Sequence, residues 1–338
     1  MKVLVTGAAG FIGFHVSRRL LEEGLDVVGL DNLNDYYSVQ LKLDRLSQLG
    51  IHAEDISDQR FCLSRSHPRF RFIKGNLEDR ALLEKTFNES YSVVINLAGQ
   101  AGVRYSKEDP SAFIQTNIVG FANILEFSQR FGIKHLIYAS SSSVYGQYEG
   151  KAEVGARVDQ PVSLYAATKR SNELLAQAYN TMYGLPTTGL RFFTVYGPWG
   201  RPDAAYYLFT EALKNGSPIQ LYNYGKMWRD FTYIDDVVEG ITRTVFQKPE
   251  ASSKVFNIGT GHSIQITEFL QKLKNICGEE GQVEKVPGHP EDIRFSCADT
   301  SELFKNIGFQ PQVHMQAGLT AFVRWYDQYT SADQRQPS

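Results

Sequence analysis

The first strand-like run and the turn that follows it constrain this chain most. The apolar segment 3–5 is followed by Gly7, Gly10 and Gly13, and a helical period runs over 12–23. Glycines at this spacing allow a tight turn, a close approach of backbone N–H groups to a pyrophosphate, and tight packing of the helix on the strand. The helix N-terminus also directs a partial positive charge at phosphate. This segment therefore predicts a dinucleotide-binding strand, turn and helix.

A carboxylate at the end of the second strand supports the same prediction. Asp31 follows segment 26–30, about twenty residues after the glycine turn, where an acidic side chain binds the adenosine ribose diol. Its charge would repel a 2′-phosphate, and neither Asn32 nor Leu33 could neutralise one, so we expect NAD rather than NADP. Later strand ends add further contacts, for which ordinary packing is an alternative explanation. The cofactor residues predicted from the turn and the strand ends are Gly7, Gly10, Phe11, Ile12, Gly13, Asp31, Asn32, Asn76, Leu77, Leu97 and Ala98.

Short apolar runs alternate with amphipathic segments through the first half of the chain. The predicted strands are 2–5, 26–30, 70–74, 92–97, 134–139 and 186–191, and the predicted helices are 12–23, 80–88, 117–131 and 164–183. Alternation of this kind predicts an α/β fold with a doubly wound parallel sheet, the Rossmann arrangement. The interval 32–69 interrupts it, and we expect there a helix followed by an irregular excursion.

Loop signals become frequent after about residue 197, with Gly and Pro clustered at 197–198, 215–218 and 287–290. We therefore expect a cofactor-binding domain over 1–190 and a smaller, partly interleaved α/β lobe over 191–330. Some segments of that lobe should return to the first domain, and 331–338 should form a polar tail.

The charge balance excludes large polyanionic partners. The 338 residues include 35 Lys+Arg and 37 Asp+Glu, a formal net charge of −2. Nucleic acids and anionic membrane surfaces require a concentrated excess of Lys and Arg, and no run approaches the roughly 18 apolar residues of a membrane helix. The three cysteines, Cys62, Cys277 and Cys297, are far apart, which argues against a disulfide framework and a metal site. We expect a cytoplasmic protein that binds no metal.

A tyrosine and a lysine are placed to share one helical face. Tyr165 and Lys169 are four residues apart in a segment of helical period. A nearby ammonium, together with the positive nicotinamide of bound NAD, favours the phenolate and lowers the pKa of the tyrosine from about 10. Such a tyrosine can act as a general base toward a sugar hydroxyl. The YxxxK spacing alone is a weak signal, and it gains weight from following a dinucleotide-binding segment.

Four serines follow the strand at 134–139. Residues 140–143 lie at the carboxyl end of that strand, the edge at which open α/β sheets bind ligands. Consecutive hydroxyls are poor core, so we interpret them as polar contacts to a substrate.

These segments together resemble the extended short-chain dehydrogenase/reductase family over about residues 1–325. The resemblance rests on TGAAGFIG, SSSSVYG and the Tyr165/Lys169 pair. Further segments are similar to NAD-dependent nucleotide-sugar epimerases, and closest to bacterial UDP-glucuronate 4-epimerases: 31–37 (DNLNDYY), 100–106 (QAGVRYS), 191–203 (RFFTVYGPWGRPD) and 228–234 (WRDFTYI). The chain departs from the family at Asn76, where Asp is usual, and at Gly99, where a second alanine is usual.

The resemblance implies a role for individual residues. Ser141 would pair with Tyr165 at the transferred hydroxyl, while Lys169 would hold the tyrosine and the nicotinamide ribose, so the last two also contact the cofactor. Arg104 receives no definite role. The substrate-binding residues implied are Ser142, Ser143, Thr194 and Arg201 at a sugar carboxylate, Arg229 at the diphosphate and Asp292 at the uridine ribose.

The implied reaction inverts C4 of a UDP-hexuronic acid without net redox change. Tyr165 takes the proton of the 4-OH while hydride leaves C4 for NAD, the 4-keto sugar turns over, and hydride returns to its opposite face. The intermediate is a β-keto acid, so the carboxylate must be held out of the alignment that releases carbon dioxide. The resemblance also implies a homodimer through a four-helix interface of 117–131 and 164–183.

Several alternatives stay open. UDP-glucose or UDP-N-acetylhexosamine 4-epimerases would share Ser141, Tyr165 and Lys169, but they need no cation such as Arg201 opposite C5. A UDP-glucuronate decarboxylase typically has Glu where Ser143 stands, and a sugar-nucleotide dehydratase has Thr-Asp-Glu in place of 141–143. A non-catalytic NAD-binding protein should have lost part of the catalytic set. For the individual arginines, a surface salt bridge or lobe packing is the alternative.

Overall fold

The central sheet has eight strands within residues 1–333, the part of the chain that the structure, a computed structural model, describes. Their order is β11-β7-β6-β5-β1-β2-β4-β3, and every neighbouring pair is parallel except β3 and β4. The strands are β1 (Lys2–Thr6), β2 (Asp26–Asp31), β3 (Phe61–Leu63), β4 (Phe70–Lys74), β5 (Val93–Asn96), β6 (His135–Ser141), β7 (Thr187–Phe192) and β11 (Ser253–Ile258). The predicted α/β fold with a doubly wound, mostly parallel sheet is confirmed.

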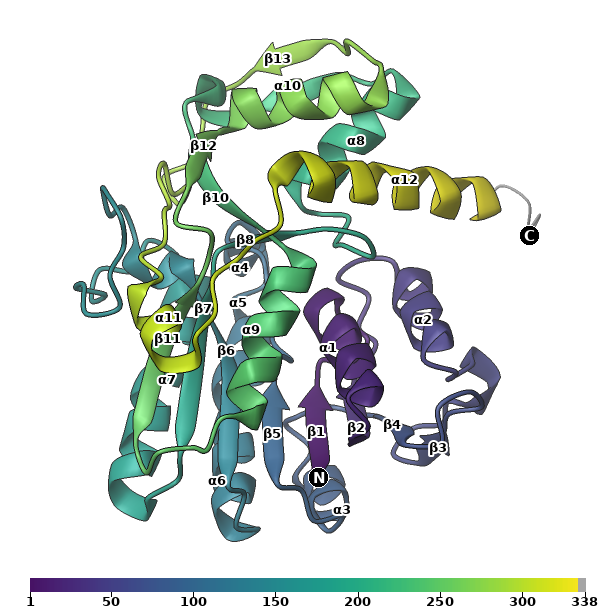
Figure 1. Cartoon of the computed structure of the whole chain (residues 1–338), viewed down its shortest axis with the longest axis vertical. Coiled ribbons are helices and arrows are strands. Elements are labelled where there is room, and N and C mark those ends of the chain that lie inside the picture. The colour runs from purple at the N-terminus through teal and green to yellow at the C-terminus, as the bar shows by residue number, and fades with distance from the viewer. Residues whose placement is uncertain (334–338) are drawn as a thin grey trace.

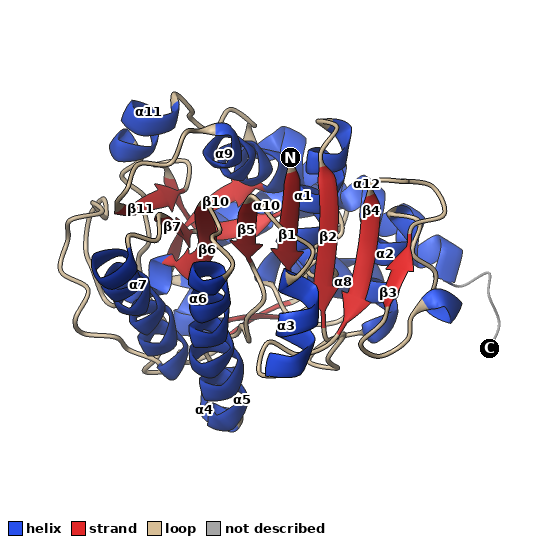
Figure 2. Ribbon diagram, turned by 90° about the horizontal axis from the view of Figure 1, so that it is seen from below, coloured by secondary structure: helices blue, strands red, loops and turns tan. Residues whose placement is uncertain are grey.

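Helices cover both faces of this sheet (Figure 2). One face carries α1 (Phe11–Glu22), α9 (Ile234–Phe246) and α11 (Ser301–Ile307), and the other carries α3 (Arg80–Phe87), α6 (Phe121–Arg130) and α7 (Leu164–Tyr183). Successive side chains of a strand point to opposite faces, so Val3 and Val5 pack with Phe14 of α1 while Leu4 packs with Phe121 of α6. Burial on both faces explains why these strands are continuous apolar runs.

Helix α7 has the bounds that its sequence period predicts, because both ends are capped. The Ser163 hydroxyl accepts a hydrogen bond from the backbone N–H of Ala166 at 3.1 Å. At the other end Gly184 adopts the left-handed conformation, with φ +69°, that commonly terminates a helix. The first turn of α7 is thereby fixed beside the carboxyl end of β6.

The interval 32–69 is more ordered than expected. Helix α2 (Val39–Gln48) is followed by a short helical turn, η1 (Ala53–Asp55), and then by β3, which pairs antiparallel with β4 as the edge strand of the sheet. The expectation of an irregular excursion after α2 is therefore wrong in this part. A three-residue edge strand carries too few apolar positions to show an alternating pattern.

The predicted helix over 117–131 begins earlier and is irregular. It is preceded by α4 (Tyr105–Glu108) and α5 (Pro110–Phe113), and η2 (Ile114–Gly120) is a π-helical segment that continues into α6. Such segments are rare and frequently occur at functional sites.

The C-terminal lobe lies beyond the carboxyl ends of the central strands (Figure 1). A three-stranded sheet joins β8 (Thr194–Tyr196), β10 (Trp228–Tyr233) and β12 (Ser263–Gln265), and β9 (Ile219–Leu221) pairs with β13 (Val283–Lys285). The other elements of this lobe are η4 (Tyr222–Gly225), α8 (Ala205–Asn215), α10 (Ile266–Cys277) and α12 (Met315–Asp333).

Two elements from the second half of the chain pack in the first: β11 joins the central sheet beside β7, and α9 packs against α1. Residues 331–333, assigned to a polar tail, end helix α12, and the rest of that tail, 334–338, lies outside the described residues. Within 1–333, no helix is both long and apolar enough to cross a membrane.

Candidate active site

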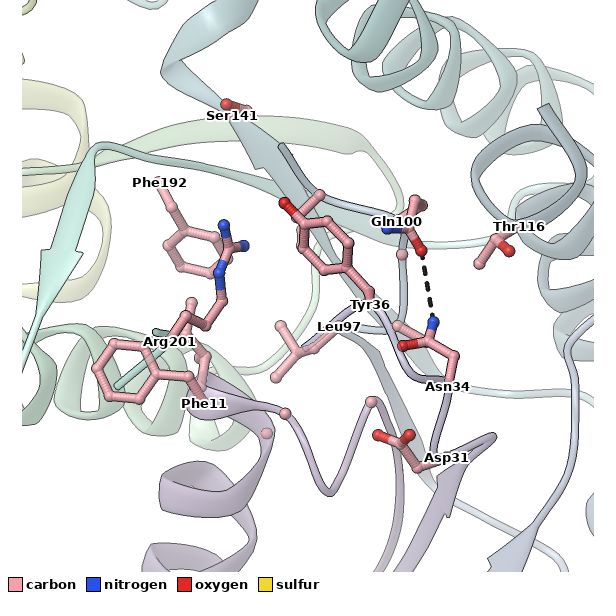
Figure 3. A pocket seen from close by; sticks show the side chains of 18 of the residues that line it. Phe11, Asp31, Asn34, Tyr36, Leu97, Gln100, Thr116, Ser141, Phe192 and Arg201 are labelled. Atoms are coloured by element: carbon pink, nitrogen blue, oxygen red, sulfur yellow. Dashed lines mark hydrogen bonds between the residues drawn. The ribbon is translucent and has the colours of Figure 1, made fainter. Parts of the chain in front are cut away.

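A cavity of about 370 Å³ opens at the carboxyl ends of β1, β2, β5 and β6, between the sheet and the C-terminal lobe. Figure 3 shows side chains from several elements directed at it, among them Asp31, Ser141 and Arg201. Sixteen of the predicted site residues line the cavity: Gly7, Gly10, Phe11, Ile12, Gly13, Asp31, Asn32, Asn76, Leu77, Leu97, Ala98, Ser141, Tyr165, Lys169, Thr194 and Arg201. Topology thus brings together residues that are far apart in the chain.

The glycine turn forms a cradle that larger residues could not make. Gly7 has φ +70°, and a Cβ there would lie 2.7 Å from the backbone nitrogen of Ala98. A Cβ on Gly13 would lie 2.0 Å from the carbonyl oxygen of Gly7. Gly10 caps α1 without a side-chain hydrogen bond, so the first N–H groups of the helix stay available to an anion. The turn fits a pyrophosphate in the way its sequence predicts.

Asp31 is buried at the end of β2 with its carboxylate already oriented. Its Oδ2 accepts a hydrogen bond from Ala9 N at 3.0 Å, and its Oδ1 accepts one from Leu33 N at 2.9 Å. A carboxylate has about four acceptor sites, so each oxygen can still accept a ribose hydroxyl. The residues present therefore fit the adenosine end of NAD.

Lys42 is a cavity residue that sequence reasoning missed. It reaches the cavity from α2, where its Nζ donates to the carbonyl oxygen of Asn34 at 2.5 Å and to Asn34 Oδ1 at 2.6 Å. Burial lowers the pKa of Lys42, and the charge of Asp31 partly opposes this shift. The only sequence signal is a lysine among the buried positions of an amphipathic helix.

Lys169 stands behind Tyr165 on the first turns of α7. Its Nζ lies 6.0 Å from the centroid of the Tyr165 ring and donates to the carbonyl oxygen of Ala139 at 3.0 Å. Burial lowers the pKa of Lys169 to about 8. The i, i+4 spacing thus produces the expected neighbours.

The pKa of Tyr165 shifts in the direction opposite to the expectation. Burial raises it, while a hydrogen bond with Ser141 and the positive charge of Arg201 act to lower it. Lys169 is not among the groups that shift the pKa of Tyr165. The expectation that its ammonium lowers this pKa is therefore not met in the protein without NAD. Ser141 and Arg201 are the residues that favour the phenolate.

The four serines divide into different roles. Ser140 donates from Oγ to Oε1 of the buried Glu173 at 2.6 Å, which makes it structural rather than free for a ligand. Ser143 donates from Oγ to Ser141 Oγ at 2.8 Å and so orients the Ser141 hydroxyl. The structure places Ser142 and Ser143 in η3 (Ser142–Tyr145), and neither is among the described residues that line the cavity.

Thr194 and Arg201 do line the cavity. The alternative for Arg201 was a salt bridge on the open surface. Arg201 does form an ion pair, with Asp203, but the pair lies at the cavity and the two side chains are only 31% and 30% exposed. Burial alone would lower the pKa of Arg201, but the adjacent Asp203 carboxylate raises it above the ordinary value. The guanidinium is thus a permanent cation beside Tyr165.

The residues predicted for the nucleotide half lie apart from this cavity. Arg104 forms a two-pronged ion pair with Asp292, at 3.0 and 3.1 Å to Oδ1 and 3.0 Å to Oδ2, and its guanidinium lies 3.8 Å from the centroid of the Tyr222 ring. Burial lowers the pKa of Arg229 to about 10, opposed by Asp292 and reinforced by Arg104. These three charged residues therefore form one cluster, which gives Arg104 a place.

Asn117 supports the cavity residue Gln100, although sequence reasoning treated it only as the start of a helix. Its Nδ2 donates to the carbonyl oxygen of Gln100 and to Thr168 Oγ1, both at 3.0 Å, and its Oδ1 accepts from Gln100 N at 2.7 Å. A Cβ on Gly99 would lie 3.0 Å from Asn117 Oδ1 and 3.1 Å from Lys169 Nζ. Gly99 therefore permits the close approach of the Asn117 and Lys169 side chains. A buried amide within a helical period was the available signal.

Fold and cavity together define a dinucleotide-binding α/β protein. Comparison with known proteins agrees: the family described as NAD dependent epimerase/dehydratase matches residues 3–259. The chain belongs to this family, and NAD is its cofactor.

Individual relatives cover nearly the whole chain. Protein CapI of Staphylococcus aureus is 46% identical over 348 residues, covering 97% of this chain and 99% of that protein. A probable UDP-glucuronate 4-epimerase of Rhizobium meliloti (strain 1021) is 42% identical and covers 97% of each chain. The crystal structure of UDP-glucuronic acid 4-epimerase from Bacillus cereus, in complex with UDP-glucuronic acid and NAD, is 30% identical with a TM-score of 0.89, over 97% of this chain and 100% of that one.

Proposed function

We propose that this protein inverts C4 of a UDP-hexuronic acid, interconverting UDP-glucuronate and UDP-galacturonate through a transient 4-keto intermediate. The observation that carries the proposal is the position of Arg201. Its guanidinium lines the same cavity as Tyr165, close enough for its charge to lower the pKa of that tyrosine. A permanent cation beside the reacting hydroxyl matches a substrate with a carboxylate on the neighbouring carbon.

The geometry of the chain supports the following catalytic roles. Tyr165 takes the proton of the 4-OH, and its hydrogen bond with Ser141 stabilises the phenolate. Ser143 holds the Ser141 hydroxyl, and Ala139 O orients the Lys169 ammonium. NAD, when bound, would supply the hydride acceptor for C4. Asp31 and the glycine cradle hold that cofactor.

The uronate requires a carboxylate that is held out of the decarboxylating alignment. Arg201 can hold it with two parallel hydrogen bonds, and Thr194 supplies a hydroxyl in the same cavity. Ser142 and Ser143 lie outside the cavity lining, so they could contact the carboxylate only if substrate binding moved η3 toward it. Arg229 and Asp292, with Arg104, are proposed for the diphosphate and the uridine ribose, since together they offer two cations and one acceptor.

The second candidate is a 4-epimerase of UDP-glucose or a UDP-N-acetylhexosamine, which would use the same Ser141, Tyr165 and Lys169. The Arg201 guanidinium argues against it, because a neutral C5 substituent would leave that cation without an anionic partner from the substrate. A decarboxylase or a dehydratase is disfavoured by the serines at 141–143, which offer no carboxyl group as an acid or base.

The decisive experiment incubates the purified protein with UDP-glucuronate without added NAD and separates the products. UDP-galacturonate is expected. A UDP-pentose, no reaction, or faster turnover of UDP-glucose would contradict the proposal.

Arg201→Ala tests the carrying observation directly. Removing one partner of a charge-assisted pair costs about 2 kcal/mol or more, so kcat/KM for UDP-glucuronate should fall about 30-fold or more. The matched control is Arg157→Ala: Arg157 pairs with an aspartate two residues later, as Arg201 does, but its side chain is 79% exposed. Unchanged turnover in Arg201→Ala would refute the carboxylate assignment.

We also propose a homodimer through α6, α7 and the segment before them. Large apolar side chains remain exposed there, which a second copy could cover. They are Ile114, Val119, Leu174, Met182 and Tyr183.

A further inference from the structure

Three of the segments that carry the family resemblance meet around the Asp203 carboxylate. Tyr36 comes from 31–37, Gly102 and Tyr105 from 100–106, and Asp203 from 191–203. We propose that Tyr36 and Asp203 are positioning residues that fix the plane of the Arg201 guanidinium for the sugar carboxylate and so suppress decarboxylation. This inference rests on the proposed function and assigns residues that it does not use.

Asp203 holds one edge of the guanidinium. Arg201 Nε donates to Asp203 Oδ1 at 3.0 Å, and Nη2 donates to Oδ2 at 2.7 Å. Such a fork fixes the orientation of the plane as well as its position. Within residues 1–333, Nη1 has no hydrogen-bond partner, so the remaining edge, Nη1 with the second N–H of Nη2, is left for another carboxylate.

Tyr36 in turn holds Asp203. Its hydroxyl donates to Asp203 Oδ2 at 3.0 Å, from a ring that packs on Tyr105 at a centroid distance of 4.7 Å. A Cβ on Gly102, which has φ +108°, would lie 2.4 Å from the Tyr36 hydroxyl oxygen. Gly102 is therefore required for this approach. Figure 3 shows Tyr36 and Arg201 among the side chains that line the cavity.

The charges keep this chain of contacts intact near neutral pH. Burial and the charge of Asp203 raise the pKa of Tyr36, so its hydroxyl stays a donor. Burial alone would raise the pKa of Asp203, but the Arg201 charge and hydrogen bonds lower it below its usual range. Asp203 thus remains an anionic acceptor for both neighbours.

Orientation decides the fate of the 4-keto uronate. If the C5–C6 bond aligns with the carbonyl π system, its electron pair enters the C4 carbonyl as an enolate and carbon dioxide leaves. The enolate then takes a proton from water at C5, and a UDP-4-keto-pentose results. The hydride removed from C4 in the first step stays behind as NADH, so each such event is recorded by reduced cofactor.

The test uses the full-length protein with its bound NAD and the variants Tyr36→Phe and Asp203→Asn. Phenylalanine keeps the ring packing on Tyr105 but removes the hydrogen bond. Asparagine presents an NH2 group to one guanidinium nitrogen and cannot complete the fork. The matched control is Asp159→Asn, because Asp159 pairs with Arg157 at the same two-residue spacing on the exposed surface.

We expect kcat/KM for epimerisation of UDP-glucuronate to fall about fivefold in Tyr36→Phe and about tenfold or more in Asp203→Asn. The share of turnovers that release carbon dioxide should rise in both variants, with a matching rise in the near-ultraviolet absorbance of NADH. Asp159→Asn should behave as wild type.

Folded Asp203→Asn protein, verified by its thermal transition, with wild-type kcat/KM and wild-type product ratio would overturn the positioning role alone. Loss of activity without a rise in carbon dioxide or NADH would also overturn it, because a merely structural role predicts that result. Wild-type protein that does not epimerise UDP-glucuronate would overturn the proposed function together with this inference.

Discussion

Lys169 should make the protein less stable than a methionine at the same position would. It is only 4% exposed and has no anionic partner among residues 1–333; its resolved contact is the hydrogen bond to Ala139 O. Burial moves its pKa from 10.5 to about 8. At about 1.4 kcal/mol for each tenfold change in proton affinity, holding this ammonium in the fold costs about 3 kcal/mol at neutral pH.

Lys169→Met removes that charge and keeps an unbranched chain of similar length. The Ala139 carbonyl loses one hydrogen bond, which costs about 1 kcal/mol. The variant should therefore be about 2 kcal/mol more stable than wild type at pH 7 while losing catalysis, a trade of stability for function.

The pH dependence gives the prediction a second signature. Below pH 8 the lysine is charged in both the folded and unfolded states, so the stability difference between the two proteins is constant. Between the folded pKa of about 8 and the unfolded value near 10.5, the unfolded chain binds more protons, and wild-type stability rises with pH. The advantage of Lys169→Met should shrink over that interval.

Urea unfolding of both proteins, freed of nucleotide, measures this difference from the transition midpoints. Nucleotide must be removed because a ligand that binds only the folded state adds its own stabilisation. A variant less stable than wild type at pH 7, or a difference that does not narrow between pH 8 and 10, would refute the reasoning.

Two further predictions test the support of the site and the assembly. Glu173→Gln should lower the free energy of unfolding by about 3–5 kcal/mol, because it leaves the Arg191 charge buried without its partner; the two side chains are 1% and 3% exposed and their closest contact is 2.8 Å. Glu126→Gln, at the exposed pair with Arg80, is the control and should cost less than about 1 kcal/mol in the same urea titration. Since Arg191 lowers the pKa of Glu173 against the effect of burial, the contribution of this pair should be present at neutral pH and lost as the pH falls through the acidic range. Leu174→Arg on α7 should convert the proposed dimer to a monomer in size-exclusion chromatography, whereas Leu63→Arg on β3 should not. Both leucines are exposed, at 55% and 67%, so neither substitution should disturb the fold. A wild-type protein that elutes as a monomer would contradict the proposed dimer.

The fold was predictable where burial imposes a clear pattern of apolar residues along an element. The run Val3-Leu4-Val5 is buried on both faces, and α7 carries a capping serine and a terminating glycine, so both elements can be recognised locally. Strand β3 could not be found in this way. Strand β3 is extended because it pairs with β4, and only three residues at the exposed edge of the sheet make that contact. The local sequence therefore carries no pattern that predicts it.

The site was predictable where residues act through a local rule. The glycine cradle, Asp31 and the Tyr165/Lys169 pair each follow from spacing along one element, and the structure brings all of them to one cavity. Asp203 shows the limit of such rules. Its partner Arg201 is two residues away, but Tyr36 is more than 160 residues away, and only the folded chain places that hydroxyl on its carboxylate.

The four serines at 140–143 illustrate how strand geometry distinguishes neighbouring residues of the same type. Adjacent residues of a strand point to opposite faces, so Ser140 and Ser141, the last residues of β6, cannot have the same role. Ser140 bonds Glu173 and Ser141 reaches Tyr165, two residues of α7 that lie about two helical turns apart. The chain then leaves the strand for the η3 turn, where Ser143 donates back to Ser141 instead of facing the cavity. Three of the four hydroxyls thus take different positions, with Ser140 bonded to Glu173, Ser141 beside Tyr165 and Ser143 supporting Ser141, because the backbone changes conformation between them.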